Sequence, residues 1–257
     1  WEFPFWDPRA MTWKEWHSKW GHLGEVDSLG RKRYLANLMA MDDGIARLLA
    51  ALDKTGQRRN TIVVFLSDNG GTINTYSNNK PLRGYKYMFG EGGVRIPLII
   101  SWPGHLPTGQ TRSGLSSAMD VFPTLLELVG AQVPDNLDGH SLVASLDSQA
   151  RDSGHMHLCF SDGKKTWSIR QGDWKLISSP GWDHNNYRLT SDNLAVRASN
   201  YIYPAGLQLF NLKKDIGETS NLAEQHSDRV AKMRGLYESW RAQMGKPRSG
   251  KVKKRAK

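Results

Sequence analysis

Apolar residues recur at intervals of three and four positions in two long stretches of the chain. One stretch covers residues 31–52, before Gly56, and the other covers residues 227–244. This spacing places the apolar side chains on one face of a helix. Helices over both ranges are therefore predicted, with Gly56 as the stop signal of the first. The first stripe consists of Tyr34, Leu35, Leu38, Met41, Ile45, Leu48, Leu49 and Leu52.

Two short runs are apolar at nearly every position. Residues 61–66 read Thr-Ile-Val-Val-Phe-Leu, and residues 97–102 read Pro-Leu-Ile-Ile-Ser-Trp. Continuous runs of this kind are typical of parallel strands that are buried on both faces. Asp120 is placed to cap a further helix that ends near Gly130. Helix, strand, loop, strand and helix in this order predict an α/β sheet flanked by helices.

The pattern changes near residue 150. Strand-like runs at residues 166–170 and 174–178 flank the turn Gln171-Gly172-Asp173, and another run lies at 207–212. These runs predict a short antiparallel sheet. Together with the last predicted helix, the sheet forms a small α+β subdomain.

We therefore divide the chain into an α/β domain (residues 1–150), the α+β subdomain (151–245) and a basic tail (246–257). The formal net charge is +10, and the tail, which has no acidic residue, accounts for +7 of it. The folded body is thus only mildly basic, and nucleic acid is not an expected partner. We predict a solvated, disordered tail rather than one that binds nucleic acid or acidic polysaccharide.

Several features limit the class of protein. The single cysteine, Cys159, excludes an intrachain disulfide, and no apolar run is long enough to cross a bilayer. The chain starts at Trp1 without a methionine or signal peptide, which suggests a fragment or a processed chain. Residues 1–30 are rich in tryptophan, which we interpret as packing rather than sugar binding, with a short helix near 12–20.

Candidate chemistry follows the first strand-like run. Residues 67–71 read Ser-Asp-Asn-Gly-Gly. Ligands of open α/β sheets bind beyond the carboxyl ends of strands, and Asp68 and Asn69 offer the oxygen atoms that Ca²⁺ and Mg²⁺ prefer. The two glycines permit a sharp turn. An Asp-Asn-Gly sequence also makes ordinary turns, so these residues alone favour a turn and leave a metal site as the alternative.

A series of motifs in fixed order resembles the sulfatase family of the alkaline-phosphatase-like superfamily. The motifs are Tyr34-Leu35-Ala36, Ser67-Asp68-Asn69-Gly70-Gly71, Leu82-Arg83-Gly84-Tyr85-Lys86, Glu91-Gly92-Gly93-Val94-Arg95-Ile96-Pro97, Trp102-Pro103-Gly104, Asp120-Val121-Phe122-Pro123-Thr124-Leu125-Leu126, Leu137-Asp138-Gly139, Gly172-Asp173-Trp174-Lys175-Leu176, Leu209-Phe210-Asn211-Leu212 and Gly217-Glu218-Thr219. The resemblance covers most of residues 31–244. It implies the C-terminal part of an alkaline-phosphatase-like mixed sheet flanked by helices, followed by the α+β subdomain.

The resemblance also implies roles for three residues. Asp68 and Asn69 match the positions that bind the active-site divalent cation, usually calcium, with magnesium as an alternative. Lys86 matches the position that contacts the sulfate group during catalysis. A cation and a lysine would stabilise the negative charge of sulfate-ester cleavage. Glu91 and Arg95 are expected to shape the loop, as an exposed pair that contributes about 0–1 kcal/mol.

Other parts of the family pattern are not found in this sequence. The family's formylglycine nucleophile is made from Cys or Ser followed by x-Pro-x-Arg, and neither Cys159 nor Ser178 is followed by that pattern. Residues 41–44, Met-Asp-Asp-Gly, lie inside the predicted helix, where we expect a helix surface rather than cation ligands. His17 and His22 lack the flanking pattern of a sulfate-binding histidine and are interpreted as surface residues.

We therefore expect the C-terminal portion of a sulfatase that acts on a sulfated small molecule or glycan. An N-terminal half with the formylglycine would be needed for activity, so the chain alone is predicted to be inactive and poorly soluble. Two alternatives remain: a phosphoryl or phosphonate ester hydrolase or transferase of the same superfamily, and a non-catalytic remnant that binds sulfated polysaccharide. The resemblance suggests a periplasmic or extracellular location. Specificity is expected in loops at residues 1–30 and 178–206, where no residue is assigned.

Overall fold

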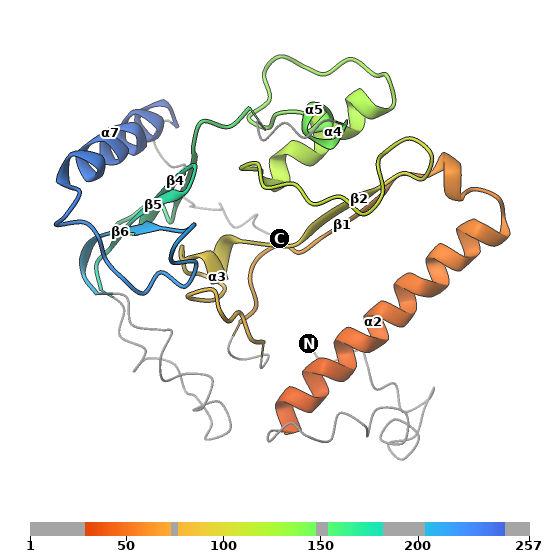
Figure 1. Cartoon of the computed structure of the whole chain (residues 1–257), viewed down its shortest axis with the longest axis horizontal. Helices are drawn as coiled ribbons and strands as arrows, with labels where there is room; N and C mark the ends of the chain where they lie inside the picture. Colours follow the sequence, from red (N-terminus) through yellow and green to blue (C-terminus); the bar gives the residue numbers. More distant parts are fainter. Residues whose placement is uncertain (1–28, 73–76, 148–153, 182–203, 245–257) are drawn as a thin grey trace, which may run out of the picture.

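A computed structural model of the chain describes residues 29–72, 77–147, 154–181 and 204–244. Figure 1 shows its two sheets and the helices around them. The elements are α2 (Leu29–Lys54), η1 (Arg58–Asn60), β1 (Val63–Leu66), α3 (Glu91–Val94), β2 (Leu98–Ser101), η3 (Ala118–Asp120), α4 (Val121–Leu128), α5 (Val143–Asp147), β3 (Leu158–Ser161), β4 (Trp167–Gln171), β5 (Trp174–Ser179), β6 (Gly206–Asn211) and α7 (Ser227–Gln243).

The two long amphipathic helices are confirmed as α2 and α7. They differ in how far their apolar faces are covered. Met233 and Tyr237 of α7 are buried, whereas Ala36 is the one buried residue of α2 among positions 31–54. Leu48 of α2 is 57% exposed. The described residues therefore leave much of the α2 stripe uncovered. None of the described helices combines the length and apolar composition that a bilayer crossing requires.

Both predicted strands of the first sheet exist, but their predicted direction is wrong. β1 and β2 form a two-stranded antiparallel sheet, with Val63 opposite Ser101 and Leu66 opposite Leu98. The prediction of burial on both faces is also wrong for the described residues, because Ile99 is 58% exposed. A run of apolar residues does not encode strand direction. The connection through α3 sets it here by returning the chain beside β1 (Figure 1).

The second sheet is an antiparallel meander in the order β3-β4-β5-β6. The predicted hairpin is confirmed as β4 and β5, and β3 is a strand that the sequence pattern did not reveal. Figure 1 shows α7 on one side of this sheet and α3 on the other. Both faces are therefore covered. The predicted domain boundary near residue 150 falls in the undescribed range 148–153 and stays a prediction.

Side chains alternate along β5 and β6 between these two covered faces. Leu176 and Leu209 belong to the core under α7, which also contains Ile169, Met233 and Tyr237. Ile177 and Phe210 belong to a second core on the opposite face, with Tyr85, Met88 and Leu212. The second core contains residues of the loop that leads to α3. That loop therefore packs against the four-stranded sheet β3-β4-β5-β6, which is called the small sheet below because it belongs to the small α+β subdomain.

The start of α4 differs from the prediction in one detail. Asp120 occupies the N-cap position of α4, but its side chain makes no capping hydrogen bond there. Ser117 caps the preceding η3 instead: its hydroxyl accepts from the Met119 amide (3.3 Å), and Asp120 Oδ2 accepts from the Ser117 amide (2.7 Å). This reciprocal pair is a capping box that includes η3. Asp120 Oδ1 accepts from His155 Nε2 over 2.7 Å. The carboxylate is buried and structural.

Candidate active site

The loop after β1 carries the side-chain oxygens of Asp68 and Asn69. Its turn is closed locally, because Ser67 Oγ donates to Asn69 O (2.8 Å) and Asn69 Nδ2 donates to Gly70 O (2.9 Å). Asp68 is exposed. Within the described part of the chain, no hydrogen bond or ion pair engages its carboxylate. The Asp68 carboxylate and the Asn69 amide oxygen are thus available to a ligand.

The glycines of this loop make close backbone contact with α3. The Gly70 amide donates to Gly93 O over 3.0 Å. A methyl group on Gly70 would overlap Gly92 O. A methyl group on Gly92 would in turn overlap Gly84 O. The Gly-Gly pairs at 70–71 and 92–93 are therefore needed because three backbone segments pass within van der Waals contact of each other.

The segment that carries Lys86 is joined to the same loop. The Lys86 amide donates to Gly71 O over 3.0 Å. Asn79 adds three bonds: its Oδ1 accepts from the Gly71 amide (3.1 Å), and its Nδ2 donates to Gly71 O (2.9 Å) and Gly84 O (3.0 Å). The structure thus brings the Asp68–Asn69 loop and the Lys86 segment together. The sequence reasoning missed Asn79, whose only signal was its position in an Asn-rich turn.

Residues on either side of Lys86 anchor this segment to the small sheet. Arg83 Nη1 donates to Gln208 Oε1 and to Glu218 O, both over 3.1 Å. Tyr85 and Met88 are 2% and 6% exposed and belong to the core on the sheet face opposite α7. Lys86 itself is half-buried. The backbone of Lys86 is positioned by the contacts of Arg83, Tyr85 and Met88 with the small sheet and by its own hydrogen bond to Gly71 O.

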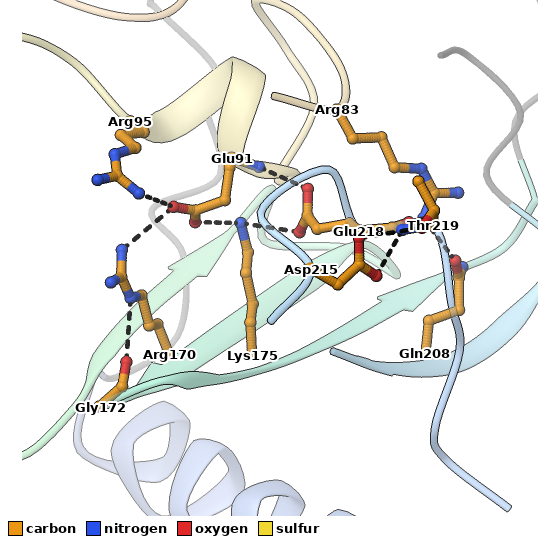
Figure 2. Close-up of polar contacts among 10 residues, drawn as sticks. All are labelled: Arg83, Glu91, Arg95, Arg170, Gly172, Lys175, Gln208, Asp215, Glu218 and Thr219. Atoms are coloured by element: carbon orange, nitrogen blue, oxygen red, sulfur yellow. Dashed lines mark hydrogen bonds and ion pairs between the residues drawn. The ribbon is translucent and has the colours of Figure 1, made fainter. Parts of the chain in front are cut away.

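A buried group of charges joins α3 to the same sheet (Figure 2). Lys175 Nζ of β5 lies 2.8 Å from Glu91 Oε1 and 3.3 Å from Glu218 Oε1. The second oxygen of Glu91 lies 3.1 Å from Arg170 Nη1 and 3.5 Å from Arg95 Nη1. The Glu91 amide donates to Glu218 Oε2 over 2.8 Å. The side chains of Lys175, Glu91 and Glu218 are at most 1% exposed.

The predicted Glu91–Arg95 pair exists, but its predicted exposure is wrong. Arg95 is half exposed and Glu91 is buried, so the pair is the outer edge of a buried group. Burial acts to raise the pKa of Glu91, but the charges of Lys175, Arg170 and Arg95 outweigh it and hold this pKa below its usual value. Glu218 is buried beside the Glu91 carboxylate, and burial raises the pKa of Glu218 despite Lys175.

Replacing Glu91 with glutamine is expected to destabilise the chain in a pH-dependent way. Because its pKa is lowered on folding, the Glu91 carboxylate stabilises the fold above its unfolded pKa, and this contribution is lost as pH falls through the folded pKa. Glu91→Gln should therefore lower the free energy of unfolding by about 2–3 kcal/mol at pH 7. The difference from wild type should shrink at acid pH. Urea unfolding from pH 7 to pH 3 measures both quantities.

The matched control is Glu238→Gln. Glu238 pairs with Arg234 on α7, and both side chains are more than half exposed. Its effect should stay within about 1 kcal/mol at pH 7. A loss in Glu91→Gln that is equally large at pH 3 and pH 7 would contradict a role for the charged carboxylate.

Comparison with known proteins identifies the family. The sulfatase family profile matches residues 13–131, and the profile of N-sulphoglucosamine sulphohydrolase, C-terminal, matches residues 84–189. A sulfatase of Formosa agariphila is 32% identical over 228 residues, which cover 80% of this chain and 39% of that protein. The chain belongs to the sulfatase family.

Other sulfatases support this conclusion. Human arylsulfatase A is 31% identical over 202 residues, which cover 75% of this chain and 39% of the enzyme. The crystal structure of Ps i-CgsB in complex with k-i-k-neocarrahexaose has a TM-score of 0.71 and 28% identity, and the match covers 93% of this chain and 47% of that one. This likeness confirms the predicted fold class. The chain spans between 23% and 39% of the length of four of the curated sulfatases it matches.

The side-chain oxygens in the loop after β1 have the chemistry of part of a cation site. Calcium takes six to eight oxygen ligands, and Asp68 and Asn69 offer carboxylate and amide oxygens of the right chemistry. No group of three or more His, Cys, Asp or Glu side chains within the described residues is placed to hold a metal ion. Asp42 and Asp43 lie exposed on α2, which confirms the prediction that they are helix-surface residues.

Cys159 does not take the place of the family nucleophile. It lies on β3, paired with Ile169 of β4, and burial raises the pKa of its thiol to about 12. A thiol held neutral in this way is a poor nucleophile. The prediction that Cys159 is a buried or idle thiol is consistent with this environment.

A cleft of about 590 Å³ includes one of the three candidate site residues in its wall. Asp68 lines it, together with Arg95 and Arg170, whereas Lys86 is not among the residues that line it. The rest of its wall comes mainly from β2 and residues 110–118. The Gly71–Lys86 junction therefore lies outside the lining of this cleft.

Several predictions lie outside the described residues. These are the helix near 12–20, His17, His22, the basic tail and most of the 178–206 loop.

Proposed function

We propose that this chain forms part of the active site of a sulfuric ester hydrolase. Asp68 and Asn69 would ligate a divalent cation, calcium or alternatively magnesium, and Lys86 would contact the sulfate group of the substrate. The observation that carries this proposal is the hydrogen bond from the Lys86 amide to Gly71 O, which fixes the lysine segment to the loop of the two oxygen ligands. The substrate would be a sulfated small molecule or glycan.

The chemistry of sulfate-ester cleavage explains why these groups belong together. Negative charge stays on the sulfuryl oxygens and grows on the leaving oxygen as the ester bond breaks. The cation, when bound, would supply Lewis-acid stabilisation of that charge. Lys86 would add a positioned positive charge that needs no reorganisation during the reaction, because the small sheet and Gly71 already fix its backbone.

We propose that the formylglycine nucleophile and the other cation ligands come from polypeptide outside these 257 residues. Three facts support this. The chain has no Cys- or Ser-x-Pro-x-Arg sequence. Within its described residues no group of three or more His, Cys, Asp or Glu side chains is placed to hold a metal ion. The chain spans at most 39% of the length of four of the curated relatives. The chain alone is then expected to be inactive. A periplasmic or extracellular location stays a prediction.

The test is sulfate release by the product of the whole reading frame that contains this chain. Lys86→Ala is expected to lower kcat/KM by roughly 10²–10³-fold, as when one charge-stabilising donor is removed. Lys80→Ala is the matched control, because Lys80 is an exposed lysine of the same loop, and it should keep wild-type activity. Equal activity in Lys86→Ala and wild type would contradict the assigned role.

The same assay separates the superfamily alternative. A phosphate monoester and a phosphonate ester with the same leaving group are offered beside the sulfate ester. The proposal expects the sulfate ester to have the highest kcat/KM. Preference for the phosphate or phosphonate ester would favour the phosphoryl or phosphonate reading.

A further inference from the structure

Tyr87 has a backbone conformation that its side chain disfavours. Its φ is +78°, and Glu218 is the one other non-glycine residue with positive φ in the described ranges. The Met88 amide donates to Tyr85 O over 2.9 Å, so residues 85–88 form a turn with Tyr87 at its third position. A type II turn requires φ near +80° there and favours glycine. A tyrosine at this position opposes folding, which points to a role for its side chain.

Packing within the described residues does not explain the choice of tyrosine. Glu218, which shares the positive φ, is buried and paired with Lys175. Tyr87 is 71% exposed. Within the described residues, its ring contacts the Lys86 ammonium, whose Nζ lies 5.6 Å from the ring centroid. The turn therefore holds an aromatic ring in solvent beside the lysine that is proposed to contact sulfate.

The backbone that carries this ring is held next to the candidate active site. Tyr85 and Met88, on either side of it, are buried against the small sheet. The Lys86 amide is bound to Gly71 O, three residues after Asp68. An aromatic face, an ammonium group and two cation ligands therefore lie on connected backbone segments.

We propose that Tyr87 packs against the sugar ring of a sulfated glycan while Lys86 contacts the sulfate carried by that ring. This inference rests on the proposed function and names its substrate class. The apolar C–H face of a pyranose packs on an aromatic ring, and the sulfate supplies the charge that the ammonium attracts. An aryl or steroid leaving group would favour an enclosed apolar pocket. Tyr87 is open to solvent, which suits a polar ring.

The test uses Tyr87→Gly, Tyr87→Phe and Lys86→Ala in the product of the whole reading frame. Carrageenan- and heparin-derived sulfated oligosaccharides are the substrates, and inorganic sulfate, which has no ring, is a competitive inhibitor. Tyr87→Gly should raise KM for the oligosaccharide roughly three- to tenfold and leave sulfate inhibition unchanged. Tyr87→Phe should keep the wild-type KM. Tyr87→Gly should also raise Tm, by about 1 °C, because glycine fits the turn.

The outcomes separate this inference from the proposed function. An unchanged oligosaccharide KM in Tyr87→Gly, with weaker sulfate inhibition in Lys86→Ala, would overturn the role of Tyr87 alone. A lower Tm in Tyr87→Gly would indicate a packing role for Tyr87 and would overturn the inference. Turnover of aryl sulfates without turnover of any sulfated oligosaccharide would also overturn it. Unchanged sulfate inhibition in Lys86→Ala would contradict the proposed function itself.

Discussion

Replacing Lys175 with methionine is expected to lower the free energy of unfolding by about 3–5 kcal/mol. Lys175 is the fully buried cation between Glu91 and Glu218, at 2.8 Å and 3.3 Å from their nearest oxygens. Methionine fills similar space but leaves two buried carboxylates close together without that charge. Removing one member of a buried ionic group costs more than the group contributes as a whole, because the remaining charges stay desolvated. Urea unfolding at pH 7 measures the loss.

Lys213→Met is the matched control for this experiment. Lys213 is an exposed lysine that follows β6, so its replacement should change the free energy of unfolding by no more than about 0.5 kcal/mol. If Lys175→Met were as stable as Lys213→Met, the buried charges would not hold α3 against the sheet as we describe.

Replacing Gly70 with alanine is expected to destabilise the chain by about 3 kcal/mol, the upper end of the cost of overpacking. The new methyl group would overlap Gly92 O, which is backbone and has no other rotamer to adopt. The loop would have to move away from α3 and lose the bond from the Gly70 amide to Gly93 O. A thermal melt detects the loss of stability, and the ¹H–¹⁵N shift of Gly93 reports separation of the two segments.

Gly44→Ala is the control for this substitution, and it is expected to raise stability rather than lower it. Gly44 lies within α2, and a methyl group there would meet no atom within 4 Å. Alanine should therefore raise helix stability by about 0.5–1 kcal/mol. A Gly70→Ala chain with wild-type stability and an unshifted Gly93 signal would contradict the close contact between the loop and α3.

The elements that follow from local pattern were predictable from the sequence. The spacing in α2 and α7 and the turn between β4 and β5 depend on neighbouring residues, so a single sequence reveals them. β3 was missed because its Leu-Cys-Phe-Ser run is short and lies outside any recognised turn pattern. The direction of β2 depends on the path of a long loop, which local patterns do not encode.

The candidate site shows the same contrast between residues that local motifs reveal and residues that only the tertiary fold brings together. Asp68, Asn69 and Lys86 were singled out because they match family motifs, and the structure joins their segments through Gly71. The roles of Lys175 and Glu218 were not predictable. A lysine side chain on a strand usually points to solvent, whereas Lys175 is buried beneath α3, between Glu91 and Glu218. Partners 84 residues apart, Glu91 and Lys175, meet only through the tertiary fold.

These contacts give the small sheet a direct part in placing the candidate site. Lys175 holds Glu91 at the start of α3, and Gly93 of α3 accepts the bond from Gly70. The same sheet holds Arg83 and Tyr85 beside Lys86. Substitution of Lys175 or Glu91 is thus expected to change the positions of Asp68 and Asn69 as well as that of Lys86.

The most direct test of the central claim is the calcium dependence of sulfate release by the product of the whole reading frame after treatment with EDTA. The account predicts that Asp68→Asn raises the Ca²⁺ concentration for half-maximal activity by about tenfold or more, because a charged ligand is lost. It predicts that Lys86→Ala lowers activity and leaves that concentration unchanged. An unchanged Ca²⁺ requirement in Asp68→Asn would contradict the claim that the loop after β1 binds the catalytic cation.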